Sequence, residues 1–506
     1  MPFTPALTLP PTKGPVMRFA LPARAAVVSA AALLVLALAP AGPALAAPAA
    51  SAAPPPLLNS LPPHNPYAGP DGTATMHGDT GSSDATALPG PAAGPLTSHR
   101  AALASACPTV LVGSDGYPLA LCTTIVGLTP TVHLLDPASG ESIAELALVK
   151  GSLLGGVYAY LDNEDRLVAV DGDRSLLRIG HHRAANGSWT LTVDRSLPLA
   201  GAVPEGDSVV GLSPDWQGRV WFATGGGLVG TADDRGGVVG TLALPAGEQV
   251  ANSISTAPAG TAVTSTAATY LLVAGPDGVP RIRWRQAYDR GPGRKPGQLS
   301  WGSGSTPTFF GPTTGTDYLT IVDNAAPGVH LLVYRTDDGA QVCSVGVLRA
   351  GGSGSENSPI GAGDAVFVAS TYGYPYPKLP AGAGPGVPAS AAFDGGLSRV
   401  DVRPDGSGCD LTWDTAVRSA AVPRLSLGDR LIHTVLRRPV IPGTDWTSLL
   451  DPYAYAEIDP RTGAVVRTAH LGAGFVYDTL QMAGTIAPGG VVYQGTTTGV
   501  VRIAAG

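Results

Sequence analysis

The sequence of 506 residues predicts an all-β fold, an eight-bladed β-propeller that follows a disordered N-terminal arm. Three observations favour this fold. Stretches typical of helices are almost absent after residue 50, while 67 Gly and 48 Pro mark frequent turns. Units of short strands repeat with about 53 residues from one unit to the next. The last unit lacks one strand, which an earlier segment would supply if the units close into a ring.

The clearest unit lies between Trp301 and Leu348. Clusters of Gly, Pro and Asp separate four short apolar runs there, which predicts an antiparallel meander of about 45 residues. A single meander cannot cover both of its faces, and repetition around a ring covers them. The predicted strands are Thr306–Phe310, Tyr318–Val322, Val329–Tyr334 and Gln341–Val347.

The other units follow the same pattern in order along the chain. The eighth shows only three strands, so we expect a strand from before Cys107 to complete it. Seven blades is the alternative, because residues 251–287 are weakly patterned. The eight units cover about residues 107–148, 155–197, 207–245, 251–287, 305–348, 357–415, 421–470 and 478–504.

Several turns between third and fourth strands place Asp before Gly, as in Asp136 to Gly140 and Asp459 to Gly463. These hairpins are similar to those of quinoprotein-dehydrogenase-like propellers. More narrowly, five phrases resemble a family of secreted bacterial and fungal β-propeller proteins. The resemblance covers most of residues 65–506 and implies fold and secretion, and no reaction. The phrases are Met76–Asp79, Gly156–Asn163, Gly302–Thr308, Val322–Asn324 and Glu356–Pro359.

The first 46 residues predict a cleavable signal peptide and therefore secretion. Basic residues precede an apolar run over residues 25–39, and Ala44-Leu45-Ala46 follows as a cleavage site. Met17 is an alternative start. Residues 47–100 predict a Pro/Ala/Gly-rich arm, partly ordered around residues 65–85, and residues 101–506 the propeller.

Charge and cysteines bear on partners and compartment. The chain has 31 basic and 38 acidic residues, and the predicted signal peptide removes three basic ones, which leaves a net charge of −10. We therefore expect a monomer that binds neither nucleic acid nor membrane. Cys107 and Cys122 bracket a predicted hairpin, while Cys343 and Cys409 lie in fourth strands of neighbouring blades. We predict disulfides 107–122 and 343–409, as suits an exported protein.

The three longest insertions, residues 287–300, 372–393 and 437–451, all fall on one predicted face. The same face collects polar residues that interrupt the strand pattern, which makes it the candidate binding face. Converging oxygen atoms there would suit Ca²⁺, with Glu356 and Asn357 as ligands. The alternative is that these residues cap strand ends. They are Asn252, Thr306, Thr308, Asp323, Asn324, Glu356, Asn357, Tyr372 and Tyr374.

The arm contains one segment rich in polar residues, Met76 to Asp84. We predict that it packs over the mouth of the ring and brings His77 and Asp79 towards Glu356 and Asn357. A histidine beside a buried carboxyl group could act as acid, base or ligand anchor. The alternative is a solvated linker.

Two functions remain open at this stage. The first is binding of a small molecule, glycan or extracellular protein on the loop-rich face. The second is an enzyme in the central funnel, either a calcium-assisted, lactonase-like hydrolase or a quinone-dependent dehydrogenase. No nucleophile–base pair, zinc motif or phosphate loop can be named. Adjacent cysteines and a set of tryptophan docking motifs, expected for a pyrroloquinoline quinone (PQQ) enzyme, are also missing from the sequence.

Overall fold

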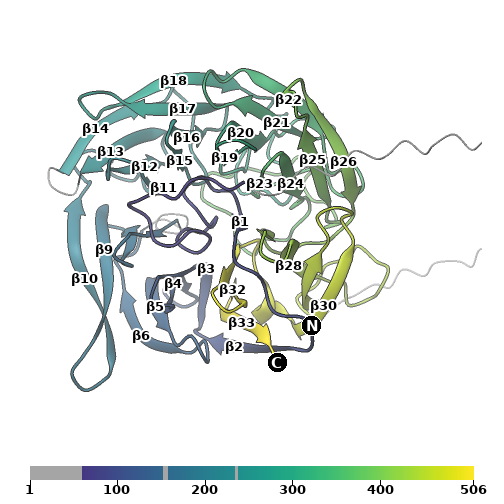
Figure 1. The fold of residues 1–506 in the computed structure, drawn as a ribbon, viewed down its shortest axis with the longest axis horizontal. Helices are drawn as coiled ribbons and strands as arrows, with labels where there is room; N and C mark the ends of the chain where they lie inside the picture. The colour runs from purple at the N-terminus through teal and green to yellow at the C-terminus, as the bar shows by residue number, and fades with distance from the viewer. Residues whose placement is uncertain (1–59, 152–157, 234–236) are drawn as a thin grey trace, which may run out of the picture. The chain divides into compact units, whose positions relative to one another are not determined.

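The computed structural model describes residues 60–151, 158–233 and 237–506. The predicted signal peptide lies outside these ranges. In them the chain forms eight β-sheets arranged around a common axis, and one short 3₁₀ turn, η1 (Phe475–Tyr477) (Figure 1). No helix within the described ranges is long and apolar enough to cross a membrane. The eight-bladed propeller is confirmed, and the seven-bladed alternative falls.

The first four blades are simple meanders, in which each strand pairs antiparallel with the next. Their strands are β3 (Ser105–Val112), β4 (Pro118–Thr124), β5 (Pro130–Leu135) and β6 (Ser142–Ala147); β7 (Tyr160–Leu161), β8 (Leu167–Val170), β9 (Ser175–Arg183) and β10 (Trp189–Pro198); β11 (Val209–Pro214), β12 (Val220–Thr224), β13 (Leu228–Asp233) and β14 (Gly237–Ala243); β15 (Ser255–Ala257), β16 (Gly260–Thr264), β17 (Ala268–Ala274) and β18 (Pro280–Ala287).

The last four blades continue the ring, and N-terminal strands join the seventh and the eighth. Their strands are β19 (Thr308–Phe310), β20 (Tyr318–Val322), β21 (His330–Arg335) and β22 (Gln341–Gly346); β23 (Ile360–Ala362), β24 (Ala365–Ala369), β25 (Leu397–Val402) and β26 (Cys409–Thr415); β27 (Arg424–Ser426), β28 (Leu431–Arg437), β29 (Pro452–Ile458) and β30 (Val465–Ala473), with β1 (Ala85–Thr86); and β31 (Gly484–Ala487), β32 (Val491–Thr496) and β33 (Gly499–Ala505), with β2 (Leu96–Ala102).

Burial follows the position of a strand within its blade. Every residue of the second strand β12 is buried, whereas no residue of the outermost strand β14 is fully buried. Inner strands are covered on both faces by neighbouring blades and so read as continuous apolar runs. The core consists of layers between adjacent blades, such as Leu121 and Val132 of blade 1 against Leu167 and Ile179 of blade 2.

Strand β2 closes the ring, as the three-stranded eighth unit predicts. It pairs antiparallel with β33, from Leu96 opposite Ala505 to Ala102 opposite Gly499. Both predicted disulfides are also confirmed. Cys107–Cys122 joins the neighbouring strands β3 and β4, and Cys343–Cys409 joins the outermost strands of blades 5 and 6.

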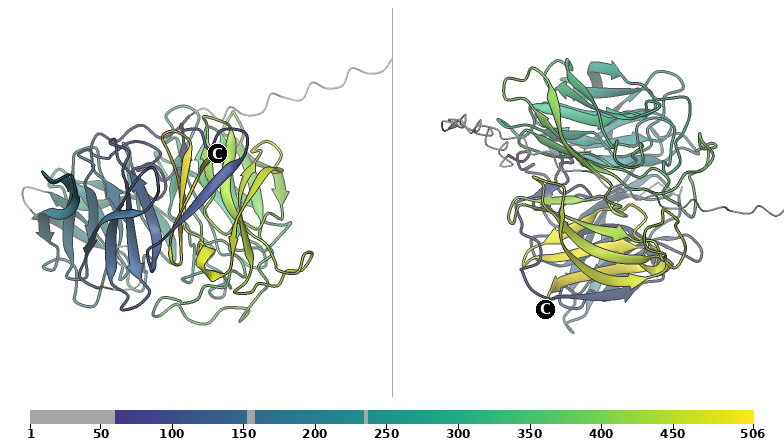
Figure 2. Two further views of the ribbon diagram at one scale, coloured as in Figure 1. Left: turned by 90° about the horizontal axis from the view of Figure 1, so that it is seen from below. Right: turned by 90° about the vertical axis from the view of Figure 1, so that its right-hand side faces the viewer.

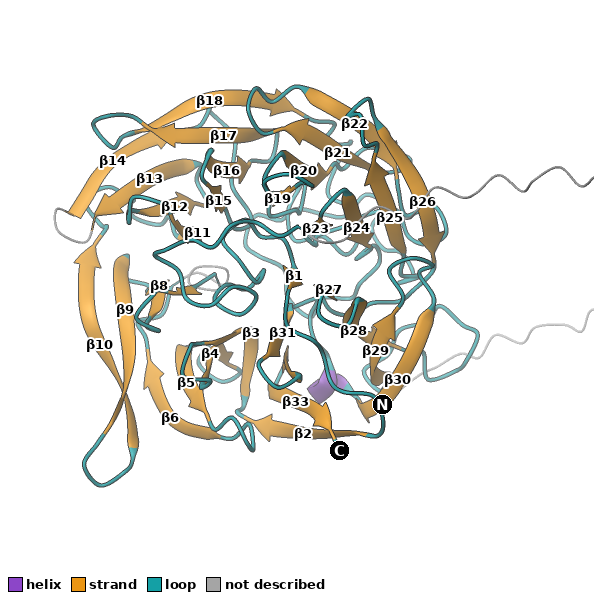
Figure 3. Cartoon of the chain, viewed as in Figure 1, coloured by secondary structure: helices purple, strands orange, loops and turns teal. Residues whose placement is uncertain are grey.

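Residues 60–91, called here the axial segment, run through the middle of the ring (Figure 3). Backbone carbonyls of this segment accept hydrogen bonds from the innermost strands of blades 4 to 7. In each of four strands, the N–H group of the central residue donates to one of these carbonyls. The pairs are Thr256 to Thr80 O in β15, Phe309 to Gly81 O in β19, Gly361 to Ser83 O in β23 and Leu425 to Asp84 O in β27. The segment thereby satisfies backbone groups that would otherwise be unpaired.

Strands run between the two faces of the ring (Figure 2). The antiparallel order puts every link between blades, and every loop between second and third strands, on one face, called here the loop face. The long segments 288–307, 370–396 and 438–451 all belong to it. Two of them are joined, since Val387 N–H donates to Arg294 O at 2.7 Å and Gly373 N–H to Pro296 O at 3.0 Å.

Candidate functional site

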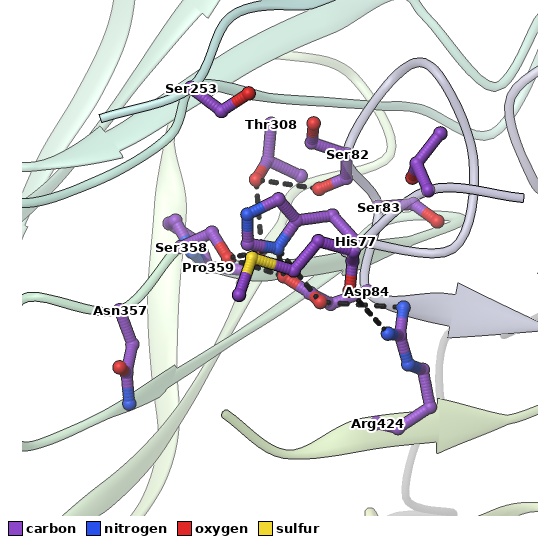
Figure 4. Close-up of polar contacts among 12 residues, drawn as sticks. His77, Ser82, Ser83, Asp84, Ser253, Thr308, Asn357, Ser358, Pro359 and Arg424 are labelled. Carbon is purple, nitrogen blue, oxygen red and sulfur yellow. Dashed lines mark hydrogen bonds and ion pairs between the residues drawn. The ribbon is translucent and has the colours of Figure 1, made fainter. Parts of the chain in front are cut away.

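A cluster of polar side chains lies where the axial segment meets blade 6 (Figure 4). His77 Nδ1 lies 3.1 and 3.0 Å from the two carboxylate oxygens of Asp84. Ser358, just before β23, places its hydroxyl 3.0 Å from the same nitrogen and donates to Asp84. The other ring nitrogen, Nε2, is buried and has no hydrogen-bond partner among the described residues.

Asp84 is held in place by a buried arginine. Arg424 Nη1 lies 3.4 Å from Asp84 Oδ1, and neither side chain is more than 2% exposed. The same guanidinium donates to Met76 O at 2.7 Å and to Gly484 O at 3.2 Å, so it ties the axial segment to blades 7 and 8. Burial lowers the pKa of Arg424, and the negative charges of Asp84 and Asp79 oppose that shift.

The axial segment adopts a costly backbone conformation beside this cluster. Ser82 and Asp84 both have positive φ, 56° and 51°, although neither is glycine. Contacts from the blades hold the turn: Thr308 Oγ1 donates to Ser82 O at 3.0 Å, and Ser255 Oγ to Ser82 Oγ at 2.8 Å. The surrounding strands therefore determine how Asp84 meets His77.

Asp79 lies in the same turn but faces other partners. Ser83 donates to its carboxylate through both the hydroxyl and the backbone N–H. Burial raises the pKa of Asp79 to about 7, despite the opposing effect of these hydrogen bonds. Asp79 is thus a titrating group near the cluster. The structure shows no hydrogen bond between Asp79 and His77.

Glu356 is the other ionisable group of this region. It lies four residues before β23, hence at the loop face, and is 9% exposed. Neither carboxyl oxygen accepts a hydrogen bond of good geometry from the residues described, although Leu299 N–H and the Asn252 side chain approach it. Burial raises the pKa of Glu356 to about 8; Leu299 N–H, the Asn252 side chain and Arg294 lower it by less. A Cβ on Gly304 would lie 2.4 Å from Glu356 Cα, so glycine permits this close approach.

Two tyrosines from different loops flank Glu356. Burial raises the pKa of Tyr158 and of Tyr376, and the charge of Glu356 is the next cause for both. Both side chains are nevertheless only half-buried. The Tyr158 ring stacks beside the His77 ring at a centroid distance of 6.4 Å, and its hydroxyl donates to Asn252 Oδ1 at 3.1 Å. Tyr158 therefore links His77 with the surroundings of Glu356.

We call the group of His77, Tyr158, Asn252, Glu356 and Tyr376 the axial site. Its members come from the axial segment and from blades 2, 4 and 6. Ser358 connects its two ends, because it contacts His77 and follows Glu356 by two residues, a backbone reach of about 7 Å.

Other predicted site residues have structural partners. Asn357 donates to Gln481 at 3.1 Å, and Asn252 donates to Gly304 O at 2.6 Å. Thr308 spans Ser82 O and Pro359 O, and Thr306 is buried beside it. These four residues lie at strand ends near the axis.

The remaining predicted residues hold loops away from the cluster. Asp323 accepts from the backbone and ring of His330, and Asn324 donates to Arg290 O and Gly293 O. Tyr374 donates to Asp478, while Tyr372 is half-buried and packs over Gly352 and Gly354. Here the alternative of capping and loop fastening describes what their side chains do.

Ser358, His77 and Asp84 do not form a nucleophile arrangement. In a serine nucleophile triad, the serine contacts one imidazole nitrogen and the aspartate the other. Here both contact Nδ1, and the serine hydroxyl donates to the aspartate. His77 cannot take a proton from Ser358 through Nε2 in this arrangement.

The donor set does not fit a calcium ion. Ca²⁺ takes 6–8 oxygen ligands, commonly with several carboxylates. Within the described ranges, no three His, Cys, Asp or Glu side chains are grouped to hold a metal ion. A carboxyl group with a pKa of about 8 is also mostly protonated at neutral pH. All four cysteines are paired in two non-adjacent disulfides, so the vicinal cysteines expected for a quinone enzyme are not provided.

Sequence reasoning missed two members of the axial site, Tyr158 and Tyr376, and also missed Arg424, which contacts Asp84. Arg424 reads as an ordinary strand residue, and Tyr158 and Tyr376 read as parts of loops. The available signals were the positions of both tyrosines on the predicted binding face and an arginine inside an otherwise buried strand.

No protein-family model and no curated protein matches this sequence. Several solved structures are similar to this chain in fold. Quinohemoprotein alcohol dehydrogenase from Comamonas testosteroni is similar with a TM-score of 0.50 and 11% identity, over 86% of this chain and 80% of that one. BamB from Moraxella catarrhalis has a TM-score of 0.37 and 13% identity, over 66% and 95%. A streptogramin B lyase has a TM-score of 0.40 and 9% identity, over 81% and 98%. At 11% identity, the first likeness shows the fold alone, a β-propeller.

Proposed function

We propose that this protein is a secreted binding propeller that holds a small polar molecule at the axial site, reached from the loop face. The observation that carries the proposal concerns two buried polar groups, the Glu356 carboxyl group and Nε2 of His77. Neither makes a hydrogen bond of good geometry to any residue that the structure describes. Secretion is supported by the predicted signal peptide, and the two disulfides are typical of oxidising compartments.

The energetic reason is the cost of leaving buried polar groups unpaired. Each such group costs about 1–3 kcal/mol, and more when it is charged. Nearby, the side chains of Asp84, Ser82 and Asn252 do have hydrogen-bond partners. A bound molecule that supplies the missing hydrogen bonds would recover this cost, and sites of this kind are concave regions with a few convergent polar groups.

An enzyme remains the second candidate, because a carboxyl group with a pKa of about 8 is suited to general acid–base chemistry near neutral pH. Its partner would be His77 Nε2. Binding is the better supported function, since no nucleophile contacts either group among the described residues.

The test is a thermal-shift screen with glucose, galactose, ethanolamine, methylammonium and acetate. We expect members of at least one chemical class to raise the melting temperature of the wild-type protein. Glu356→Gln should abolish that increase. Glu164→Gln, at a carboxylate that is 65% exposed, is the matched control and should preserve it. No shift with any compound, or an equal shift in Glu356→Gln, would contradict binding at this site.

A further inference from the structure

We infer that the ligand of the axial site is a small primary ammonium compound, whose N–H groups donate to the Glu356 carboxylate and to Nε2 of His77. This inference rests on the proposed function and narrows it to one class of ligand.

The first argument is that the partnerless atoms of the site are hydrogen-bond acceptors. Ser358 donates its hydroxyl hydrogen to Asp84, so the proton between His77 and Asp84 belongs to Nδ1. The Nδ1–H tautomer of the ring satisfies Asp84, whose charge Arg424 balances. Its Nε2 then carries a lone pair. Together with Oε1 and Oε2 of Glu356, this gives three acceptors for which the described residues supply no donor in good hydrogen-bond geometry.

The second argument is charge. A buried carboxylate requires a positive partner, and none of the described residues provides the Glu356 carboxylate with one in hydrogen-bond contact. The cation that influences it, Arg294, directs its guanidinium to the carbonyls of Gly384 and Gln298. An alkylammonium group supplies one positive charge and three N–H donors from a single nitrogen, which matches one carboxylate and one further acceptor.

The third argument is the surroundings of the carboxyl group. Tyr158 and Tyr376 are half-buried beside Glu356, and aromatic rings favour cations on their faces. A calcium ion does not fit, because the three acceptors are far fewer than the ligands that Ca²⁺ requires. A primary ammonium ion needs fewer ligands and has apolar carbon that the tyrosine rings can cover.

Binding of an ammonium ion would release a proton. Glu356 has a pKa of about 8 in the free protein, so near neutral pH it is largely protonated and must ionise to accept the cation. The groups that face it are Arg294, Tyr158, Tyr376 and the Asn252 amide. Tyr158 and Tyr376 have pKa values raised further above neutrality. Asp79 has a pKa of about 7, titrates in the same window, and is therefore the necessary control.

The test is isothermal titration calorimetry of the full propeller with methylammonium chloride at pH 6.5 and 8.5. We expect affinity to rise about 20-fold over this interval, because the carboxylate fraction of a group with a pKa near 8 rises by that factor. The binding enthalpy measured in two buffers of different ionisation enthalpy gives the number of protons released. At pH 6.5 we expect close to one proton per bound methylammonium. Tetramethylammonium, which has the charge but no N–H group, should bind at least about tenfold more weakly.

Variants separate the groups that titrate. Glu356→Gln should remove both the pH dependence and the proton release, whereas Asp79→Asn should retain them. The wild-type pH series tests the inference by itself if Glu356→Gln does not fold. Binding of glucose but not methylammonium, lost in Glu356→Gln, would overturn the inference and leave the proposed function intact. Absence of binding by every compound tested would overturn both.

Discussion

Two buried carboxyl groups near the axis of the ring, Asp84 and Glu356, have opposite environments. Asp84 contacts an arginine, a histidine and a serine, and its side chain is fully buried. Glu356 lies two residues from that serine and has no hydrogen-bond partner among the described residues. Both positions belong to the same region of one fold, so general burial cannot account for the difference.

The comparison separates a structural group from a candidate functional one. Asp84 joins the axial segment to blades 6 and 7, and its partners satisfy its charge within the chain. The Glu356 side chain makes no hydrogen bond of good geometry to any part of the chain that the structure describes, so its burial costs free energy. An uncompensated group of this kind is typical of a site that awaits a partner.

The largest expected effect tests the structural role of Asp84. Arg424→Met should destabilise the protein by about 3–5 kcal/mol, because it leaves the Asp84 charge buried without its cation. Urea denaturation at pH 7 measures the change. Arg461→Met is the control, since the Arg461–Asp459 pair is exposed at the arginine and should contribute below about 1 kcal/mol. Equal effects of the two substitutions would remove the distinction between Asp84 and a surface pair.

A prediction of intermediate size tests whether Glu356 is an uncompensated buried carboxyl group. The pKa of Glu356 is raised from an unfolded value near 4.5 to about 8, so the unfolded state ionises first and folding loses stability as pH rises through this window. Wild-type stability should therefore fall relative to Glu356→Gln by about 3 kcal/mol between pH 5 and pH 8. Urea denaturation of both proteins at pH 5, 6.5 and 8 measures the difference. A constant difference across this range would show that Glu356 is compensated after all.

The smallest effect concerns the wall that holds Ser82 and Asp84 in their strained turn. Thr308→Val removes the donor to Ser82 O and Pro359 O while it preserves side-chain shape, and should cost about 1–2 kcal/mol. Thr97→Val provides the control, because Thr97 donates at 3.4 Å on an exposed strand. Thermal denaturation compares the two. A Thr308→Val protein as stable as the control variant would mean that the turn does not depend on blade 5.

Much of the ring was predictable because each blade is a local structure. The predicted strands at 318–322 and 341–347 match β20 and β22 to within one residue, since Gly, Pro and Asp clusters define the turns between them. Ring closure was predictable from a missing strand, and the cysteine pairs from their places in strands.

The path of the axial segment was not predictable in the same way. Its contacts use backbone carbonyls, such as Gly81 O to Phe309, which any residue type can supply. The sequence therefore carries no periodic signal for them. Polar residues at strand ends also look alike in sequence. Asn324 holds a loop by donating to two carbonyls, whereas Glu356 makes no hydrogen bond of good geometry to the residues in the described ranges. The distinction depends on distant residues that face each other only in the folded ring.

The axial segment has a consequence for the order in which the molecule assembles. Its hydrogen bonds to blade 7 join residues far apart in the sequence. Arg424 donates to Met76 O across 348 residues, and Ser426 donates to Leu88 O across 338. Each blade can form from neighbouring hairpins, but these long contacts must await the seventh blade. The axial segment is thus synthesised early, but it can reach its final position only after the seventh blade has been made.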